Sequence, residues 1–392
     1  MVFDRKLLTY YLILATFIYS GCQSEYTEFT RVCTYNDGVG SNLHPKADAY
    51  QDLLNQYVRK GLPGIVLLVR DNQGEWVGSA GKADIEQNVA MSPCHISKAA
   101  SITKMFVAVA TLQLVEEGVL QLDERITKWL PSSVTNKIEN ADAVTLRQLL
   151  NHTTGIYDII DDDSFYLSVL NDPSKIRTLE DLAEFVYKKP AVFPPGERAS
   201  YSNTNTLLVS MIIEKATGKP HDQVIRERTI IPLGLTDTHY YSYNKLPTNT
   251  AQGYFDLYNN GTILNVSNYY TASGYGGLYS NVFDLQIFIE ALFREQKLLS
   301  TQSMQHMMEF TTTIENGRQL GAGVMKDFLF LQEDQFAYGH RGRDLAYTAD
   351  LFWFPNQDIT VAMLLNYGTD SESTLRPVFN NFRIDLGELL VE

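Results

Sequence analysis

The sequence predicts an α+β fold in which an antiparallel five-stranded sheet, flanked by helices, carries an inserted and mostly helical domain. Two observations lead to this prediction. Strand-like hairpins lie near both ends of the chain, and the long segment between them shows helical periodicity with extended loops. Strands at both ends with helices between them are typical of a sheet domain that is interrupted by an insert.

The sheet strands come from two hairpins and one further stretch. In the first hairpin the turn Asp71-Asn72-Gln73-Gly74 supplies the glycine and asparagine that favour a reversal between strands. In the second hairpin Pro355-Asn356-Gln357-Asp358 has the same character. The expected strands, in order, are 64–70, 75–81, 321–331, 345–354 and 359–367.

Helices are expected around and between these strands. An amphipathic helix over 47–60 ends at Gly61 and Pro63, before the first hairpin. Further helices are expected at 105–115, 146–150, 179–187 and 204–217. The predicted domain organisation is therefore a sheet part at about 46–104 and 266–392, with a helical insert at about 105–265.

Composition excludes several classes of protein. The chain has 392 residues, of which 44% are hydrophobic and 20% charged, as in ordinary globular proteins rather than disordered or fibrous ones. The formal net charge is −14, and no basic stripe offsets it, so we expect no nucleic-acid partner. The seven histidines are scattered without His-x-x-x-His or Cys-x-x-Cys spacing, so the sequence predicts neither a metal site nor a cofactor.

The N-terminus has the pattern of an export signal. Arg5 and Lys6 precede an apolar run at 7–19, which is too short to span a membrane stably and ends at small residues. Because Cys22 follows Ser20-Gly21, the segment also resembles a bacterial lipoprotein signal, although Tyr19 stands where that pattern prefers an aliphatic residue.

We therefore expect a signal peptide at 1–21 and a tether at 22–45. Cys22 would be lipidated and anchor an exported protein to the membrane on the periplasmic or cell-surface side; plain secretion is the alternative. The other two cysteines, Cys33 and Cys94, fit either a disulfide or two free thiols.

The first candidate for chemistry is Ser101 with Lys104. The apolar run from Met105 to Val115 predicts a buried helix, and residues three apart at its first turn share one face. The lysine amine can therefore reach the serine hydroxyl and accept its proton. Burial and the positive end of the helix dipole both disfavour the ammonium, which lowers the amine pKa toward that of a general base.

The spacing alone is weak, because Ser-x-x-Lys occurs three times in the chain. The other two pairs, Ser79 with Lys82 and Ser242 with Lys245, are not expected at a helix start. A lysine that snorkels from a structural helix is the alternative interpretation of Lys104.

Two later motifs could complete a site for acyl transfer. Tyr201-Ser202-Asn203 precedes the helix at 204–217; its phenol can carry a proton, and its amide can bind a substrate carbonyl or simply cap the helix. His340-Arg341-Gly342 precedes the last hairpin. A glycine there lets a strand edge approach a ligand, and the N–H of Arg343 can donate to an oxyanion together with that of Ser101.

In this order the three motifs resemble those of the serine β-lactamase and penicillin-binding (DD-peptidase) family, in its class C-like branch. The resemblance extends from about residue 45 to the C-terminus. It includes Leu149-Leu150-Asn151-His152-Thr153-Thr154-Gly155, Phe193-Pro194-Pro195-Gly196, Gly276-Gly277-Leu278-Tyr279-Ser280 and Tyr338-Gly339-His340.

The resemblance implies a role for each motif residue. Ser101 is acylated, Lys104 and Tyr201 share the proton transfers, and Asn203 holds the substrate amide. His340 lines the cleft opposite Tyr201.

It also implies that the Arg343 N–H completes the oxyanion hole, with Gly342 beside it. His152 corresponds to a family histidine that we interpret as structural.

One departure from the family pattern bears on the substrate. β-Lactamases of this branch carry Lys-Thr-Gly where this chain has His340-Arg341-Gly342, and a histidine is mostly neutral near pH 7. DD-peptidases and esterases that are similar to this family do use histidine there. We therefore hypothesise that Arg341 or Arg343 binds a substrate carboxylate through a bidentate contact; solvated strand-end charges are the alternative.

The predicted function is an exported serine hydrolase that works through a Ser101 acyl-enzyme. Its substrate would be a D-amino-acid peptide, as for a D-Ala-D-Ala carboxypeptidase acting on a peptidoglycan stem peptide, or an ester. A class C-like β-lactamase is the alternative enzyme. A catalytically silent lipoprotein that keeps the cleft for binding or sensing is the alternative of another class.

Overall fold

A computed structural model describes residues 44–392 except 241–245, 270–272, 313–317 and 371. The chain divides into two compact units, Met1–Val32 and Cys33–Glu392, and the described residues belong to the second. The predictions for the signal peptide, for Cys22 and for nearly all of the tether lie outside the described residues, as does the pair Ser242 and Lys245.

The main sheet is antiparallel throughout and has nine strands among the described residues, so the predicted count of five was wrong. Both hairpins were predicted correctly. The fifth long strand is β12, whereas only three residues of the stretch 321–331 join the sheet, as β11. Across the sheet the order is β3 (Val89–Ala90), β2 (Gly74–Asp84), β1 (Gly64–Asp71), β14 (Ile359–Leu365), β13 (Thr348–Phe354), β12 (Ala337–Arg343), β11 (Met325–Asp327), β10 (Gln319–Leu320) and β9 (Thr311–Thr312).

The strands β3, β9 and β10 could not be found by periodicity because each has only two residues, whereas β12, which has seven residues and contains His340, was missed. Smaller sheets lie outside the main one. They are β4–β8–β5 (Ser97–Lys98, Leu278–Ser280 and His239–Tyr240) and β6–β7 (Tyr254–Phe255 and Leu264–Asn265).

The predicted helices are present, with one change. The segment expected as one helix at 179–187 forms a short helix, α6, and then a 3₁₀ turn. The α-helices are α1 (Ala47–Arg59), α2 (Thr103–Glu116), α3 (Ser132–Thr135), α4 (Leu146–Leu150), α5 (Asp163–Asn171), α6 (Leu179–Ala183), α7 (Asn203–Thr217), α8 (His221–Ile225), α9 (Ile231–Leu233), α10 (Val282–Ile289), α11 (Thr301–Met307) and α12 (Arg376–Val391). The 3₁₀ and π turns are η1 (Ala100–Ile102), η2 (Ile126–Lys128), η3 (Ile159–Asp161), η4 (Glu184–Val186), η5 (Arg226–Ile230) and η6 (Glu290–Arg294).

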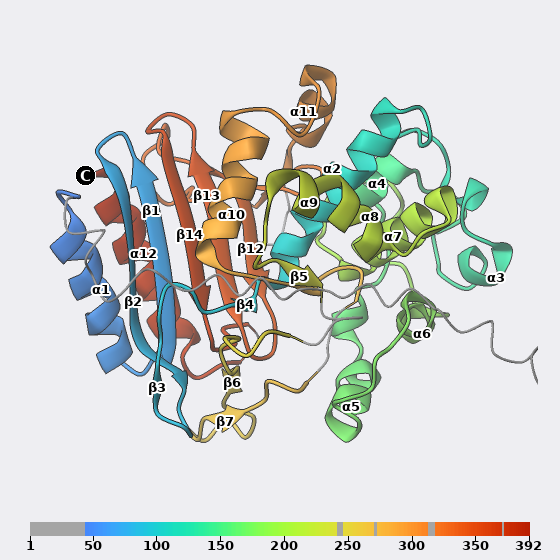
Figure 1. The fold of residues 1–392 in the computed structure, drawn as a ribbon. Coiled ribbons are helices and arrows are strands. Elements are labelled where there is room, and N and C mark those ends of the chain that lie inside the picture. The colour runs from blue at the N-terminus through green and yellow to red at the C-terminus, as the bar shows by residue number, and fades with distance from the viewer. Residues whose placement is uncertain (1–43, 241–245, 270–272, 313–317, 371) are drawn as a thin grey trace, which may run out of the picture. The chain divides into compact units, whose positions relative to one another are not determined.

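Helices cover both faces of the sheet. The terminal helices α1 and α12 pack on one face, and α10 packs on the other, beside the helical part of the unit (Figure 1). Successive residues of β1 point to opposite faces, so Val66 and Leu68 join the core on the α2 and α10 side, while Ile65 and Leu67 join the core under α1 and α12. The long apolar strands are therefore buried on both sides, as their sequences require.

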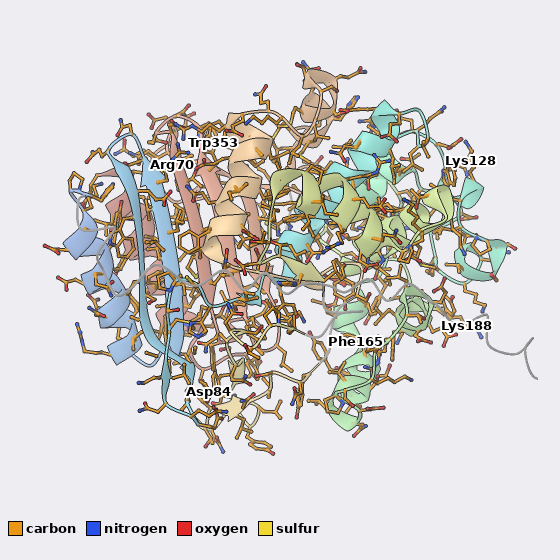
Figure 2. All side chains as sticks on the ribbon, in the orientation of Figure 1. Arg70, Asp84, Lys128, Phe165, Lys188 and Trp353 are labelled. Atoms are coloured by element: carbon orange, nitrogen blue, oxygen red, sulfur yellow. The ribbon has the colours of Figure 1, made fainter. Side chains whose placement is uncertain are left out.

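Side chains at one end of the sheet show how the α10 layer is attached to it. Arg70 of β1 and Trp353 of β13 lie near this end (Figure 2). Arg70 forms an ion pair with Glu290 of η6, and Trp353 stacks on Phe293 of the same turn, with ring centroids 6.0 Å apart. These contacts fix the layer that covers the sheet next to α2.

The helix α2 lies in the core between the sheet and the helical part. Its residues from Thr103 to Leu112 are all buried, so its first turn is held firmly in place. Cys94, shortly before this helix, is disulfide-bonded; Cys33 lies outside the described residues, so its pairing with Cys94 stays a prediction. Within the described part of the chain, no helix is both long and apolar enough to cross a bilayer.

Candidate active site

Ser101 lies in η1, directly before α2, at a point where the backbone is constrained. Ala100 has a φ of 49°, in the left-handed region that costs an L-residue about 1–2 kcal/mol. The Thr103 hydroxyl donates to the Ala100 carbonyl (2.6 Å) and accepts from the N–H of Leu278 (3.2 Å). Strand β8 therefore holds in place the turn that contains Ser101.

Lys104 points to Ser101, as the helical spacing predicts. Its side chain is buried, and its Nζ lies 3.0 Å from the Ser101 Oγ. The same Nζ donates to the Asn203 Oδ1 (2.7 Å) and to the Tyr275 carbonyl (2.9 Å). Three acceptors therefore define the position of the amine, which makes a snorkelling lysine the wrong interpretation.

The environment of Lys104 suits a general base. Burial lowers the pKa of Lys104 to about 7, and the negative charges of Asp158 and Asp344 work in the opposite direction. An amine with this pKa is largely unprotonated slightly above neutral pH. It can then accept the Ser101 proton.

Tyr201 stands beside both residues, just before α7. Its ring lies 5.1 Å from the Lys104 Nζ and 5.9 Å, centroid to centroid, from the ring of His340. Burial raises the pKa of the Tyr201 phenol well above its usual value, and its hydrogen bond to Ser101 works in the opposite direction. The phenol therefore keeps its proton at neutral pH.

The ring of His152 packs against the ring of Tyr201. The two rings stack with centroids 4.6 Å apart, and the His152 Nδ1 accepts from the N–H of Ser202 (3.2 Å). Burial and the charge of Lys104 lower the pKa of His152 to about 3, so the ring stays neutral and acts as a packing surface. This agrees with the structural role that we expected.

Asn203 is the first residue of α7, and a carboxylate that the sequence analysis missed fixes its amide. Its Nδ2 donates to the Asp158 Oδ2 (3.1 Å), and its backbone N–H donates to the Asp158 Oδ1 (3.0 Å). Asp158 is only 6% exposed. In the sequence it stands close to Asp161, Asp162 and Asp163, a pattern typical of a solvated loop.

His340 lies in β12 and is neutral. Its Nδ1 donates to the Arg341 carbonyl (2.6 Å), because a carbonyl only accepts, so the Nε2 keeps its lone pair. Burial and the charge of Lys104 hold the pKa of His340 well below its ordinary value. It cannot supply the positive charge that a lysine would supply at this position.

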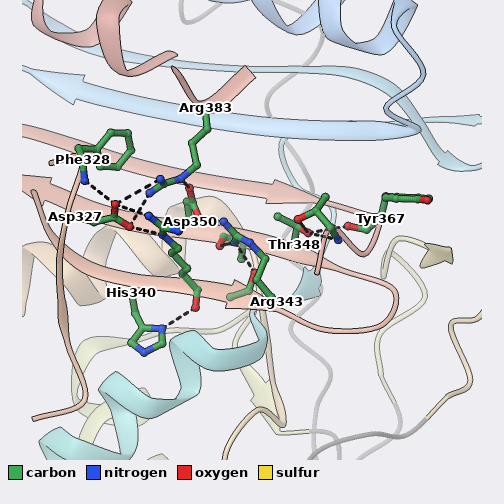
Figure 3. A network of polar contacts seen from close by, with 12 residues as sticks. Asp327, Phe328, His340, Arg343, Thr348, Asp350, Tyr367 and Arg383 are labelled. Atoms are coloured by element: carbon green, nitrogen blue, oxygen red, sulfur yellow. Dashed lines mark hydrogen bonds and ion pairs between the residues drawn. The ribbon is translucent and has the colours of Figure 1, made fainter. Parts of the chain in front are cut away.

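Both predicted arginines already bind carboxylates of the protein itself, and Figure 3 labels Arg343 and its partner Asp350. Arg341 contacts Asp327 (Nη2 to Oδ1, 2.7 Å), and Arg343 contacts Asp350 (Nη2 to Oδ1, 2.8 Å). Arg383 of α12 bridges the two aspartates. Carboxylate recognition by Arg341 or Arg343 stays a prediction, and their contacts give these residues a structural task.

This buried ion network ties α12 to the strands beside the site. Burial alone would raise the pKa of Asp327, but the guanidiniums of Arg383 and Arg341 hold it well below its usual range. A charge removed from such a buried group leaves its partner uncompensated, which costs about 3–5 kcal/mol.

Gly342 explains why β12 can lie against η1. A Cβ at this position would be 2.2 Å from the Ala99 carbonyl oxygen. The strand and the Ser101 turn are therefore in backbone contact, where the N–H groups of Ser101 and Arg343 are predicted to form an oxyanion hole. The hole itself stays a prediction.

A cleft of about 1240 Å³ opens over these residues. Ser101, Tyr201 and Asn203 line it together with Arg341 and Arg343, while Lys104 and His340 are almost fully buried.

The cleft also contains Arg318, a half-buried cation that the sequence analysis missed. Its charge acts on both Tyr201 and His340. No motif contains this arginine, so the sequence carried no signal for it.

Comparisons with known proteins agree with this geometry. The family model "Beta-lactamase" matches residues 48–378. A "Putative D-alanyl-D-alanine carboxypeptidase" of Escherichia coli (strain K12) is 27% identical over 336 residues, which is 74% of this chain and 75% of the relative.

Two solved structures are also similar. The D-stereospecific amidohydrolase from a Streptomyces species is 29% identical with a TM-score of 0.76, over 86% of this chain and 98% of that one. The D-amino acid amidase from Ochrobactrum anthropi SV3, complexed with L-phenylalanine amide, is 25% identical with a TM-score of 0.76, over 88% and 97% of the two chains. The chain belongs to the beta-lactamase family and is a serine hydrolase.

Proposed function

We propose that this protein hydrolyses peptides or amides of D-amino acids, or related esters, through an acyl-enzyme on Ser101. The observation that carries the proposal is the 3.0 Å contact between the Ser101 Oγ and the buried amine of Lys104. A base with a pKa near 7 at this distance can take the proton of the serine hydroxyl and so activate it as a nucleophile. A binding protein that had lost catalysis would not need to keep such a base.

In the proposed reaction each transferred proton has a donor and an acceptor, and each bond that forms is matched by one that breaks. Neutral Lys104 accepts the Ser101 proton as the Oγ bonds to the substrate carbonyl carbon. The bond from this carbon to the leaving nitrogen or oxygen then breaks, and Tyr201 passes a proton to the leaving group. Lys104 returns the Ser101 proton to the Tyr201 phenolate and is neutral again. It then takes a proton from the water that attacks the ester carbonyl, and this proton passes to the Oγ as its bond to the acyl carbon breaks, which releases the acid product and restores Ser101. Asn203 positions the substrate amide through its remaining hydrogen-bonding capacity.

The substrate class rests on the relatives and on the charges of the cleft. The similar proteins are named a putative D-alanyl-D-alanine carboxypeptidase, a D-stereospecific amidohydrolase and a D-amino acid amidase. Arg318 lines the cleft and offers a cation near Tyr201 for the terminal carboxylate of a peptide. We therefore propose a D-amino-acid peptide with a free carboxylate, such as a peptidoglycan stem peptide, as the preferred substrate. The neutral His340 makes β-lactam hydrolysis the weaker candidate.

Export and anchoring are part of the same proposal. The charged residues, apolar run and Ser20-Gly21-Cys22 at the N-terminus support a lipoprotein signal. Metabolic labelling with a radioactive fatty acid tests this. Label in the wild type that is absent from Cys22→Ala supports the anchor, and label retained by the variant contradicts it.

Intact-mass measurement tests the chemistry. The protein is exposed separately to a fluorophosphonate and to a penicillin, with Ser101→Ala as the control. A single adduct on the wild type and none on the variant supports the nucleophile, and labelling of the variant overturns it. A long-lived penicillin adduct indicates a peptidase, rapid turnover a β-lactamase, and fluorophosphonate labelling alone an esterase-like site.

A further inference from the structure

Asp158 is a buried carboxylate directly behind the proposed catalytic base. It accepts two hydrogen bonds from Asn203, through the backbone N–H and the Nδ2, and one from the N–H of Ile160 (3.3 Å). With the Nδ2 turned to Asp158, the Oδ1 of the same amide must face the other way. There it accepts from the Lys104 Nζ at 2.7 Å.

These contacts form one chain of hydrogen bonds from carboxylate to amide to amine. A neutral side chain at position 158 with a donor in place of one carboxylate oxygen would oppose the Asn203 Nδ2, and the amide would turn over. Its NH₂ group would then face Lys104. The orientation of Asn203 therefore depends on Asp158.

We propose that Asp158 is a positioning residue of the acyl-transfer reaction: it orients Asn203 so that the amide oxygen holds Lys104, and its negative charge sets the pH at which Lys104 becomes a base. The proposal rests on the function proposed above for Ser101 and Lys104.

The charged groups around Lys104 and Asp158 determine whether the loss of the Asp158 charge raises or lowers the pKa of Lys104. Carboxylates near Lys104 favour its ammonium, whereas the buried histidines nearby are neutral. Burial and the charge of Asp161 raise the pKa of Asp158, whereas the N–H donors of Ile160 and Asn203 and the Lys104 ammonium lower it and favour the carboxylate. Asp158 faces Lys104. The other titratable groups near these two residues are Asp161, Asp344, His152, His340, Tyr166, Tyr201 and Tyr275.

Removal of the Asp158 charge should therefore move the activity profile in one direction. Without this anion the ammonium of Lys104 is less stable, and an Asn203 amide that has turned over destabilises it further. Both effects lower the pKa of Lys104, so the acidic limb of the profile moves to lower pH, by about one unit. At the same time Lys104 loses the acceptor that holds it, so the plateau rate falls about 10-fold to 100-fold.

The test measures the rate constant for fluorophosphonate labelling of Ser101 between pH 5 and 9, which needs no natural substrate. Asp158→Asn is compared with the wild type and with Asp163→Asn, which removes an exposed carboxylate from the start of α5, shortly after Asp158 in the chain. The expected result is a slower plateau with a shifted limb for Asp158→Asn only. Asp158→Glu keeps the charge, so the acidic limb of its labelling profile should lie close to the wild-type position even where its plateau rate is low.

Several outcomes would overturn the proposal. A limb that stays in place in Asp158→Asn, whatever the plateau rate, means that Asp158 acts only as a structural residue. An equal shift in Asp163→Asn means that any charge in this part of the chain has the same effect. If thermal unfolding shows that Asp158→Asn does not fold, Asp158→Glu is the deciding variant. An acidic limb that is displaced by about one pH unit in Asp158→Glu contradicts the positioning role of Asp158. A wild type that is not labelled at all contradicts the proposed function instead.

Discussion

The α-carbon of Gly342 lies so close to the carbonyl oxygen of Ala99 that any side chain between them would overlap that oxygen. This contact presses β12 against the turn that carries Ser101. It gives the glycine of the third motif a steric task, separate from any contact with substrate.

Replacement of this glycine should therefore damage the site geometry. In Gly342→Ala, β12 must move away from η1, which costs about 1–3 kcal/mol of unfolding free energy. The fluorophosphonate labelling rate should fall at least about 100-fold, since a displacement of about 1 Å has such an effect. Gly218→Ala is the control. Its Cβ would meet nothing within 4 Å, so it should lose stability through its φ of 68° but keep the labelling rate.

The pKa of Lys104 predicts a specific pH profile. Below pH 7 the amine carries a proton and cannot accept another, so the labelling rate should fall about tenfold per pH unit. Above pH 7 the rate should reach a plateau. Lys104→Arg keeps the positive charge but cannot lose it, so above pH 7 it should be at least about 100-fold slower than the wild type, and its rate should not show the limb near pH 7. A variant with a wild-type plateau would show that Lys104 is not the base.

Residues that act through local spacing could be predicted from the sequence. Ser101 and Lys104 are three positions apart at a helix start, and the helix itself is clear from its apolar run. The two hairpins were equally clear, because strand-like runs and the turn residues between them are local patterns. The positions of Tyr201 and His340 beside Ser101 followed only from the resemblance to a family.

Contacts between distant parts of the chain could not be predicted. Asp158 lies 45 positions before Asn203, and Arg383 lies 56 positions after Asp327. Arg341 looked like a ligand for substrate because the sequence does not show that Asp327 reaches it. Charged residues can be assigned to substrate or to structure only when their partners in the fold are known.

His152 should make stability depend on pH. Its pKa is about 3 in the folded protein and near 6.5 in the unfolded chain. Between these values the unfolded chain binds a proton that the folded protein does not, so folding loses free energy as the pH falls below 6.5. The contribution of the neutral ring is complete above this pH.

The variant His152→Gln isolates this effect, because its side chain does not titrate. At pH 8 it should be less stable than the wild type. The difference should shrink by about 1.4 kcal/mol per pH unit below 6.5. Urea unfolding between pH 4.5 and 8 measures the difference. A difference that stays constant across this range would show that His152 titrates alike in both states.

Arg318 should distinguish substrates by their terminal group. Arg318→Ala removes a cation from the cleft beside Tyr201. For a peptide that ends in a D-alanine carboxylate we expect kcat/KM to fall about 10-fold to 100-fold, as for other charged hydrogen bonds. For the matching peptide amide, which has no carboxylate, the change should stay within about threefold. Equal losses for both substrates would show that Arg318 does not read the carboxylate.

Arg341→Ala is the comparison variant, and Arg341 binds Asp327. Its removal leaves a buried carboxylate with one partner fewer, so the free energy of unfolding should fall by about 3 kcal/mol. The loss of kcat/KM should then be similar for the acid and the amide. A loss confined to the acid would instead restore the carboxylate-binding role first predicted for Arg341, and would mean that substrate competes with Asp327 for the guanidinium.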